Sequence, residues 1–428
     1  MDIISILLAL GIIGFFALVS AILYLFTSFG KNVTTLATLD KTPAVTTQAF
    51  LANIATSCGG SLLHFPTDSC QILNDNTTYF KTLLADIRQA KTSIVLLTYV
   101  WKSDEYSAEL FDSLCAAAQR QVVVRLLVDA EGGTISAKTI TKLREAGVEI
   151  YFFRPFEIGK LSLYISRVHR RAFLIDGTIG YFGGMSLSKR WFKTALDKDY
   201  VYTDIMYRTT GEAVAPIAST FGELWSAYSG TIAQDLVSPD TFLNRRQSNA
   251  FSLSHSPRQD VHPLTYAFWY AIMCAKEEII IVNPYFIPGK AIAKILCQKA
   301  QAGVRVKIIT QGTSETRLVQ ASCRSYYQQL LTAGVEIYEH QQKHLHTKVL
   351  VVDSYFTIAG SANLDLRSQR INLEFIIGIQ SAEFATKHLE IITSYQTDLK
   401  QINRRDWVNR PWYRKLIQHT LHLFSEQL

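Results

Sequence analysis

The string AGVEIY occurs twice in this chain, at residues 146–151 and again at residues 333–338. Each copy stands third in a series of segments with helical periodicity, every one of which leads into an apolar strand pattern. The strand patterns are 93–99, 122–129 and 148–153 in the first series, and 278–286, 304–310 and 335–340 in the second. An identical string at the same place in two matching series indicates an internal duplication.

Helices that alternate with strands predict an α/β fold, with sheets flanked by helices. We expect two repeats, residues 68–240 and 256–428, each with a mixed, largely parallel sheet, packed about a pseudo-two-fold axis. A polar stretch at 236–260 marks the boundary between them. With 428 residues, of which 48% are apolar, the chain has enough material for two domain cores.

A histidine motif follows each AGVEIY string. The first motif is His169-x-Arg171-x4-Asp176, then Gly183-Gly184-x-Ser186. The second is His346-x-Lys348-x4-Asp353, then Gly360-Ser361-x-Asn363. A single histidine in an apolar strand is usually a core residue, but two copies at equivalent places in a repeat are unlikely to arise by accident.

The spacing suits attack on an anionic centre such as a phosphodiester. In a strand, residues two apart point to the same face, so each histidine lies beside its cation, Arg171 or Lys348. The cation would hold phosphoryl oxygens while the imidazole faces phosphorus. Ser186 and Asn363 are candidates for hydrogen bonds to the phosphate. The small residues at 183–184 and 360–361 would let a ligand approach the backbone closely.

The duplication supplies a second histidine to the same cleft. One imidazole could act as the nucleophile, and the other could carry protons to and from the alcohols. Asp204 and Glu374, each on the strand expected after its motif, are candidates for orienting the imidazoles. We place both motif aspartates, Asp176 and Asp353, in the candidate catalytic set, but interpret them as structural charges at the turns.

This chemistry needs no metal and no cofactor. A zinc site is the alternative use of the histidines that surround the second motif, at positions 340, 344 and 346. No carboxylate or cysteine completes such a site nearby, and the first repeat has only one histidine at the equivalent place. We therefore predict no metal site.

The N-terminus predicts a membrane anchor. No charged residue occurs between Ile3 and Gly30, which is long enough for one membrane-spanning helix within residues 1–30. A secretory signal is the alternative, but the basic start and the cleavage site are missing. Lys31 directly after the span favours a cytoplasmic catalytic domain. Residues 31–67 are expected to form a linker, and the net charge of +7 permits anionic partners without selecting one.

The two motifs in a duplicated chain resemble the phospholipase D superfamily, and most closely its bacterial cardiolipin synthase branch. The resemblance spans roughly residues 75–415 and is carried by HRRAFLIDGTIGYFGGMS, NPYFIP, LHTKVLVVDSYFTIAGSANLDLRSQRINLEF and WVNRPW. The chain departs from the family pattern at Arg171, where lysine is usual, at Ser186, where asparagine is usual, and in having one expected span where many members have two.

The resemblance implies a phosphatidyltransferase of the inner membrane with a phospholipid substrate. One phosphatidylglycerol would transfer its phosphatidyl group to a histidine, and a second would accept it, which yields cardiolipin. The alternatives are a phospholipase D that uses water as acceptor, a metal-independent nuclease, and a scaffold without activity. The anchor and the modest charge argue against nucleic acid as a partner. The sequence decides neither the attacking histidine nor the oligomeric state.

Overall fold

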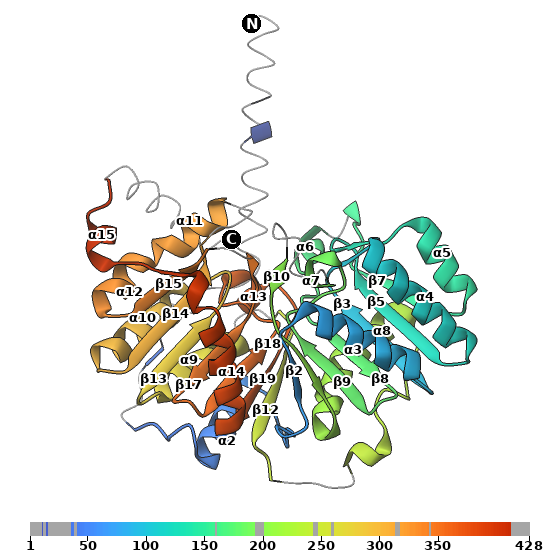
Figure 1. Cartoon of the computed structure of the whole chain (residues 1–428), viewed down its shortest axis with the longest axis horizontal. Coiled ribbons are helices and arrows are strands. Elements are labelled where there is room, and N and C mark those ends of the chain that lie inside the picture. Colours follow the sequence, from blue (N-terminus) through green and yellow to red (C-terminus); the bar gives the residue numbers. More distant parts are fainter. Residues whose placement is uncertain are drawn as a thin grey trace, which may run out of the picture.

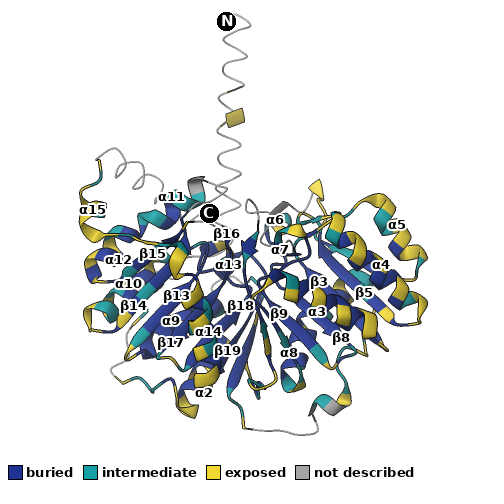
Figure 2. Ribbon diagram, viewed as in Figure 1, coloured by how far each residue is buried: buried dark blue, intermediate teal, exposed yellow. Residues whose placement is uncertain are grey.

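The computed structural model describes residues 41–158, 161–192, 201–242, 247–257, 261–312, 317–341 and 344–411, and in addition residues 11, 14, 15, 36 and 37. Two sheets stand side by side, and helices cover their outer faces (Figure 1). The strands are buried along most of their length, whereas the outer helices expose one face (Figure 2). Each sheet belongs to one of the two repeats.

The first repeat forms a seven-stranded sheet in the order β2-β11-β9-β8-β3-β5-β7. Its main strands are β2 (Gln71–Leu73), β3 (Ser93–Thr98), β5 (Val123–Asp129), β7 (Glu149–Phe153), β8 (Ala172–Ile175), β9 (Ile179–Gly183) and β11 (Met206–Thr209). The helices are α3 (Asn76–Gln89), α4 (Glu105–Gln119), α5 (Ala137–Glu145), α6 (Leu161–Ile165), α7 (Lys189–Phe192) and α8 (Val214–Ser229). Short strands β4 (Trp101–Lys102) and β6 (Gly133–Thr134) pair beside this sheet.

The second repeat forms a nine-stranded sheet in the order β1-β12-β19-β18-β17-β13-β14-β15-β20. Its strands are β1 (Ser61–Leu63), β12 (Ala250–His255), β13 (Glu278–Val282), β14 (Arg305–Gln311), β15 (Glu336–His340), β17 (Val349–Val352), β18 (Phe356–Gly360), β19 (Glu374–Gln380) and β20 (Leu399–Gln401). The helices are α9 (Pro263–Cys274), α10 (Gly289–Gln301), α11 (Arg317–Ser325), α12 (Tyr327–Ala333), α13 (Leu366–Arg370), α14 (Ala382–Ser394) and α15 (Arg404–Val408). The middle seven strands repeat the order of the first sheet.

The sheets are mixed, as expected, but the prediction that they are largely parallel is wrong. Only β3, β5 and β7 in the first sheet and β13, β14 and β15 in the second run parallel to one another. The other described neighbours are antiparallel. The strands after each histidine motif are joined by tight turns at Asp176–Gly177 and Asp353–Ser354, and a tight turn can connect only antiparallel strands.

The segment expected to be a linker is partly regular and belongs to the second repeat. Within it, α2 (Gln48–Cys58) begins with Thr47 as its N-cap, whose hydroxyl accepts from the Phe50 amide. Phe50, Leu51 and Ile54 are buried in the core beside α9, and β1 pairs with β12 at the edge of the large sheet. The amphipathic helix α2 was therefore not predicted from this Thr-, Ala- and Ser-rich segment.

Two further expectations concern the start of the second repeat and the membrane span. After the first repeat, the chain enters the second sheet at β12, which begins at Ala250, inside the polar stretch and before the expected start of the second repeat at residue 256. In the part of the chain that the structure describes, no helix is both long and apolar enough to cross a bilayer. The expected span lies almost entirely outside the described residues.

The inner faces of the two sheets pack against each other in one apolar core. Phe182 on β9 meets Phe375 on β19 edge to face, with ring centroids 6.0 Å apart. The same core contains Leu97 and Val168 from the first repeat and Val349 and Ile377 from the second. This continuous core holds the two repeats in one orientation. It therefore also fixes how the strand ends of the two sheets lie relative to one another along its upper edge in Figure 1.

Candidate functional site

The two motif histidines lie at the interface between the repeats. His169 and His346 lie just before β8 and β17, not within them, so the prediction that each shares a strand face with its cation needs correcting. Each histidine is hydrogen bonded to the backbone of the other repeat. The His169 amide donates to the Leu373 carbonyl at 2.9 Å, and the His346 amide donates to the Thr203 carbonyl at 2.8 Å.

The residue before each histidine is also held in an equivalent way. The Val168 amide donates to the Asp129 carboxylate at 3.0 Å, and the Leu345 amide donates to Oε1 of Gln311 at 2.5 Å. Asp129 ends β5 and Gln311 ends β14, which are equivalent strands. The middle parallel strand of each repeat therefore positions the backbone that carries the histidine.

The imidazoles are paired with carboxylates from the opposite repeats. Nδ1 of His169 lies 2.9 Å from Oε1 of Glu374, and Nδ1 of His346 lies 2.5 Å from Oδ2 of Asp204. All four side chains are buried or nearly so. A carboxylate at Nδ1 favours the tautomer with the proton on that nitrogen, which leaves the Nε2 lone pair for a substrate.

On the second repeat, Glu374 is held by two hydroxyl groups. Ser361 donates to Oε2, and Ser368 donates to Oε1 at 2.7 Å. Ser368 is positioned in turn by α13, because its amide donates to the N-cap Asp365 at 2.7 Å. Glu374 therefore has three side-chain partners and little freedom to turn away from His169.

On the first repeat, Asp204 is held differently. It accepts from the Ile205 amide at 2.9 Å and from the indole of Trp191 at 3.3 Å, and it lies 3.8 Å from Nζ of Lys348. Gly184 occupies the place that Ser361 has in the other repeat. A Cβ at Gly184 would lie 2.3 Å from Oδ1 of Asp204, so only glycine leaves room for this carboxylate.

The two cations contact their histidines but differ in geometry. Nζ of Lys348 lies 2.7 Å from Nδ1 of His346 and also donates to the carbonyl of that residue. Nη1 of Arg171 donates to the His169 carbonyl, and its Nε donates to Ser186 at 3.0 Å. Nη2 of Arg171 is buried and has no hydrogen-bond partner among the described residues, which leaves a donor for a bound anion.

The two residues predicted to bind phosphate, Ser186 and Asn363, have different hydrogen-bond partners. The Oγ of Ser186 accepts a hydrogen bond from Arg171, so this side chain positions the cation. The backbone N–H of Asn363 donates to Oγ of Ser368 at 3.1 Å. Within the described part of the chain, the buried side-chain Oδ1 of Asn363 has no partner. An amide oxygen accepts, so the unpartnered Oδ1 suits a hydroxyl group of a substrate, and only the Nδ2 group of Asn363 could donate to a phosphate oxygen.

Burial favours the neutral form of both imidazoles. Desolvation, Arg171 and Lys348 lower the pKa of His169, against the opposing effect of Glu374. Desolvation and Lys348 lower the pKa of His346 to about 3. Arg171 also lowers the pKa of His346, so each histidine is within electrostatic reach of the cation of the other motif. Bound phosphate would add negative charge and raise both values.

The other charged groups of the site respond to the same burial. Desolvation lowers the pKa of Lys348 to about 8, although Asp204 opposes this. Burial by itself disfavours ionised carboxylates. The pKa of Asp204 is nevertheless lowered by Lys348 and His346, and that of Glu374 by His169 and the two serine hydroxyls. Both carboxylates therefore stay ionised beside their histidines.

Asp176 and Asp353 do not reach the histidines, so the structure does not support their place in the catalytic set. A strand separates each from its histidine, a path of roughly 20 Å at about 3.3 Å per residue. Asp176 instead accepts from the amides of residues 91–93, and Asp353 from those of residues 276–278. Both fasten the segment before a parallel strand, in keeping with the structural interpretation.

The glycine positions of the motifs also have another use than expected. A Cβ at Gly183 would lie 2.5 Å from the Ile205 carbonyl, and one at Gly360 would lie 2.2 Å from the Phe375 carbonyl. Both glycines also have positive φ, of 145° and 154°. They allow close approach of the backbone at Ile205 and Phe375, each the residue after a site carboxylate, and the expected approach of a ligand is not what requires them.

Several residues of this site escaped the sequence reasoning. Ser361 was seen only as a small residue, and Ser368, Trp191 and Asp365 were not considered. Tyr99, at the end of β3, places its ring against His169 with centroids 5.7 Å apart. The serines and Asp365 lie within GSANLDLRS, so the density of polar residues after the second motif was the available signal.

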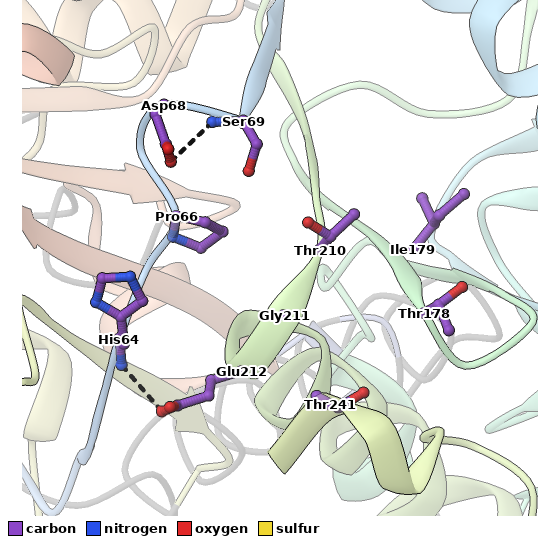
Figure 3. Close-up of a pocket in the computed structure, with 10 residues that line it drawn as sticks. All are labelled: His64, Pro66, Asp68, Ser69, Thr178, Ile179, Thr210, Gly211, Glu212 and Thr241. Atoms are coloured by element: carbon purple, nitrogen blue, oxygen red, sulfur yellow. Dashed lines mark hydrogen bonds between the residues drawn. The ribbon is translucent and has the colours of Figure 1, made fainter. Parts of the chain in front are cut away.

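A second hollow lies at the opposite end of the first repeat, beside the turn that carries Asp176 (Figure 3). It encloses about 430 Å³ and is lined by His64, Asp68 and Glu212 together with small polar residues. The His64 amide donates to Glu212 at 3.1 Å. The lining contains two acids and no lysine or arginine, so this hollow is unsuited to a phosphate.

No group of three or more His, Cys, Asp or Glu suited to a metal ion occurs among the described residues. His340, which the zinc alternative would require, lies at 3.8 Å from Asp398 and edge to face with Tyr395.

Comparison with known proteins places this site in a family. A family model described as "Cardiolipin synthase, PLD-like domain" matches residues 83–225 and 269–396, one match in each repeat. The chain belongs to this family. Membership confirms the resemblance to the phospholipase D superfamily and the expectation of an enzyme. The two matches also cover the motifs and the strands that carry both carboxylates.

Relatives named cardiolipin synthase align over most of the chain. One from Alkalihalophilus pseudofirmus is 29% identical over 391 residues, which cover 89% of this chain and 76% of that protein. A cardiolipin synthase A from Wigglesworthia glossinidia brevipalpis is 28% identical over 377 residues, with coverage of 85% and 75%.

Solved structures share the cardiolipin synthase family's fold at low identity. Phosphatidylserine synthase from Haemophilus influenzae superposes with a TM-score of 0.67 at 13% identity, over 89% of this chain and all of that one. Polyphosphate kinase from Porphyromonas gingivalis gives 0.52 at 13% identity, over 91% of this chain and 57% of the other. These similarities concern the fold alone.

Proposed function

We propose that this protein is a cardiolipin synthase that transfers a phosphatidyl group between two phosphatidylglycerol molecules through a phosphohistidine. The observation that carries the proposal is the composite site. Two imidazoles are each paired at Nδ1 with a carboxylate of the other repeat, and each lies beside a buried cation of its own motif. The relatives' printed names supply the lipid class.

The first step forms the covalent intermediate. Nε2 of one histidine attacks the phosphorus of the first phosphatidylglycerol, and the bond from phosphorus to the glycerol oxygen breaks. The other histidine, protonated once the anionic lipid is bound, donates its Nε2 proton to the departing oxygen. The products are a phosphatidylated histidine and free glycerol.

The second step returns the enzyme to its starting state. The other histidine, now neutral, takes the proton from a glycerol hydroxyl of the second phosphatidylglycerol. The hydroxyl oxygen attacks phosphorus, and the bond between phosphorus and nitrogen breaks. Cardiolipin leaves and the nucleophile regains its lone pair.

The cations hold the phosphoryl oxygens throughout. Lys348 acts as a point charge, and Arg171 offers the free Nη2 beside an already anchored Nε. Asn363, which follows the second motif, supplies a further polar contact through its side-chain amide. Asp204 and Glu374 orient the imidazoles and stabilise the imidazolium form while it carries the proton.

The proposal includes a membrane location. The uncharged segment within residues 3–30 would anchor the protein in the inner membrane by a single span, with the catalytic repeats on the cytoplasmic side. A membrane anchor suits a reaction between two lipids, because both substrates are confined to the same surface.

The test uses purified full-length protein in phosphatidylglycerol vesicles, with lipid products identified by mass spectrometry. We expect cardiolipin and an equal amount of glycerol. Phosphatidic acid without cardiolipin would make water the acceptor and the protein a hydrolase. His169→Ala and His346→Ala should each abolish the product, whereas His64→Ala, in the hollow at the far end, should leave it unchanged. If wild-type protein forms no lipid product, the proposed function is wrong.

A further inference from the structure

We propose that apolar side chains described on either side of residues 159–160, between β7 and β8, form a docking tip that inserts into the surface of an anionic lipid bilayer beside the two motif histidines. The docking tip consists of Phe156, Ile158 and Leu163. The inference rests on the proposed function, since it concerns how a lipid in a bilayer reaches that site.

The docking tip exposes an unusual amount of apolar surface. Phe156, Ile158 and Leu163 are 63%, 84% and 50% exposed. The other exposed large apolar side chains in the described repeats, Leu62, Val123, Ile232, Val261 and Val408, are isolated along the chain, and of these only Ile232, at 79%, is more exposed than Leu163. Single exposed apolar residues are ordinary, but three within one short segment indicate a surface that is covered in use.

The tip is held in place by defined contacts. Nη1 of Arg154 donates to the Leu163 carbonyl at 3.1 Å and to the Ser166 carbonyl at 3.0 Å, which ties the start of the segment to its end. The ring of Phe156 meets Tyr164 edge to face, with centroids 5.4 Å apart. The apolar side chains thus face outward although their backbone is fastened to the repeat.

The tip also lies next to the catalytic cleft. Ser166 stands just before Val168 and His169, whose backbone is bonded to the other repeat. The guanidinium of Arg167 lies 4.2 Å from the centre of the Tyr164 ring, and Arg367 on α13 donates to the Ile165 carbonyl at 3.4 Å. Helices α6, α7 and α13 all lie at the upper end of the molecule (Figure 1).

Charge around the cleft favours a bilayer with anionic headgroups as the occupant. Lys189 on α7 and Arg367 on α13 are exposed, and Arg190 is partly exposed. These cations outnumber the one acid between the tip residues, the exposed Glu157, and apolar side chains together with cations suit a membrane surface of charged headgroups over acyl chains. Phosphatidylglycerol is itself anionic, so the bilayer and the substrate present the same chemistry.

The first experiment compares two forms of phosphatidylglycerol with full-length protein. Replacement of all three tip residues by serine should lower turnover on vesicles at least tenfold, while turnover of short-chain phosphatidylglycerol dispersed as monomers stays within twofold. The matched control is Leu62→Ser. The exposed fraction of Leu62, 48%, is close to that of Leu163, but Leu62 lies on β1, remote from the two motif histidines. This control should behave as wild type on both substrates.

The outcomes are separable. Wild-type protein that is inactive on both lipids refutes the proposed function. An active wild type whose triple variant keeps full vesicle turnover overturns the docking tip, as does an equal loss on both lipids, which would mean a structural role. If the triple variant keeps vesicle turnover but loses an oligomer seen by light scattering, a second copy of the chain covers the tip and the bilayer proposal is wrong.

A second experiment observes insertion directly. Phe156→Trp in vesicles that contain phosphatidylglycerol with brominated acyl chains should add quenched fluorescence above the wild-type signal. Leu62→Trp should add fluorescence that the bromine does not quench. Equal, unquenched signals from both variants would refute insertion of the tip.

Discussion

Nδ1 of His169 lies 2.9 Å from the carboxylate of Glu374, although 205 positions of sequence separate the two residues. The reciprocal pair, His346 and Asp204, makes the equivalent contact in the opposite direction. Neither repeat contains a complete histidine–carboxylate pair by itself. Both pairs therefore depend on the packing of the two repeats, and relative movement between the repeats would separate both pairs at once.

The first prediction concerns this exchange of carboxylates. Glu374→Gln and Asp204→Asn each keep the shape of the side chain but remove the charge that orients and stabilises the imidazole. We expect kcat to fall by roughly 10²–10⁴-fold in each variant, with little change in KM. Glu383→Gln, an exposed change on α14, is the control. A loss below threefold in both variants would contradict the assigned orienting role.

Equivalent positions in the two repeats should respond differently. Gly184→Ala places a methyl group on Asp204 and should lower kcat at least roughly 100-fold, because the carboxylate must move. Ser361→Ala only removes one hydroxyl from Glu374 and should cost about threefold to tenfold. Thermal unfolding of both variants checks that they fold. Equal losses would show that the missing side chain at position 184 is unimportant for Asp204.

Arg171 and Ser186 should function as a pair. Arg171→Lys removes the guanidinium contacts to Ser186 and to the His169 carbonyl, and should lower kcat/KM at least tenfold. The double change Arg171→Lys with Ser186→Asn restores the combination usual in the family pattern and should recover part of that loss. A double variant no better than the single one would mean that the two positions do not compensate each other.

Activity should decline on the alkaline side of about pH 8. Burial lowers the pKa of Lys348 to about 8, so its charge is complete below this value and is lost as the pH rises through it. The decline should approach tenfold per pH unit at high pH. Lys348→Arg keeps the charge and should shift the alkaline limb upward by at least one unit, whatever its maximal rate. Lys387→Arg, on α14, should leave the limb in place.

The motif aspartates should affect stability and not chemistry. Asp176→Asn retains a residue that tolerates the positive φ of 53° but weakens the bonds from three amides. We expect a loss of about 1–3 kcal/mol in the free energy of unfolding, measured with urea. The kcat of the folded fraction should stay within twofold of wild type. A loss of kcat beyond tenfold without destabilisation would return Asp176 to the catalytic set.

Much of the site was predictable because the duplicated chain contains the histidine motif twice. The repeated AGVEIY string and the spacing of His169 and His346 from their cations identify the fold family, the two half-sites and the candidate carboxylates. Ser186 and Arg171 stood out as departures from the pattern. The helix α2 was missed because a short amphipathic pattern in a Thr- and Ala-rich segment is weak without the core that receives it.

The sequence by itself determined which residue types recur at which spacing, since each motif is local and survives inspection of the chain alone. Only the tertiary structure decided which carboxylate serves which histidine, because that depends on how two sheets pack through the core around Phe182 and Phe375. The same packing decided that Gly184 must lack a side chain while Ser361 can donate a hydrogen bond. Contacts between distant segments have no local signature, and this is the physical reason for the division.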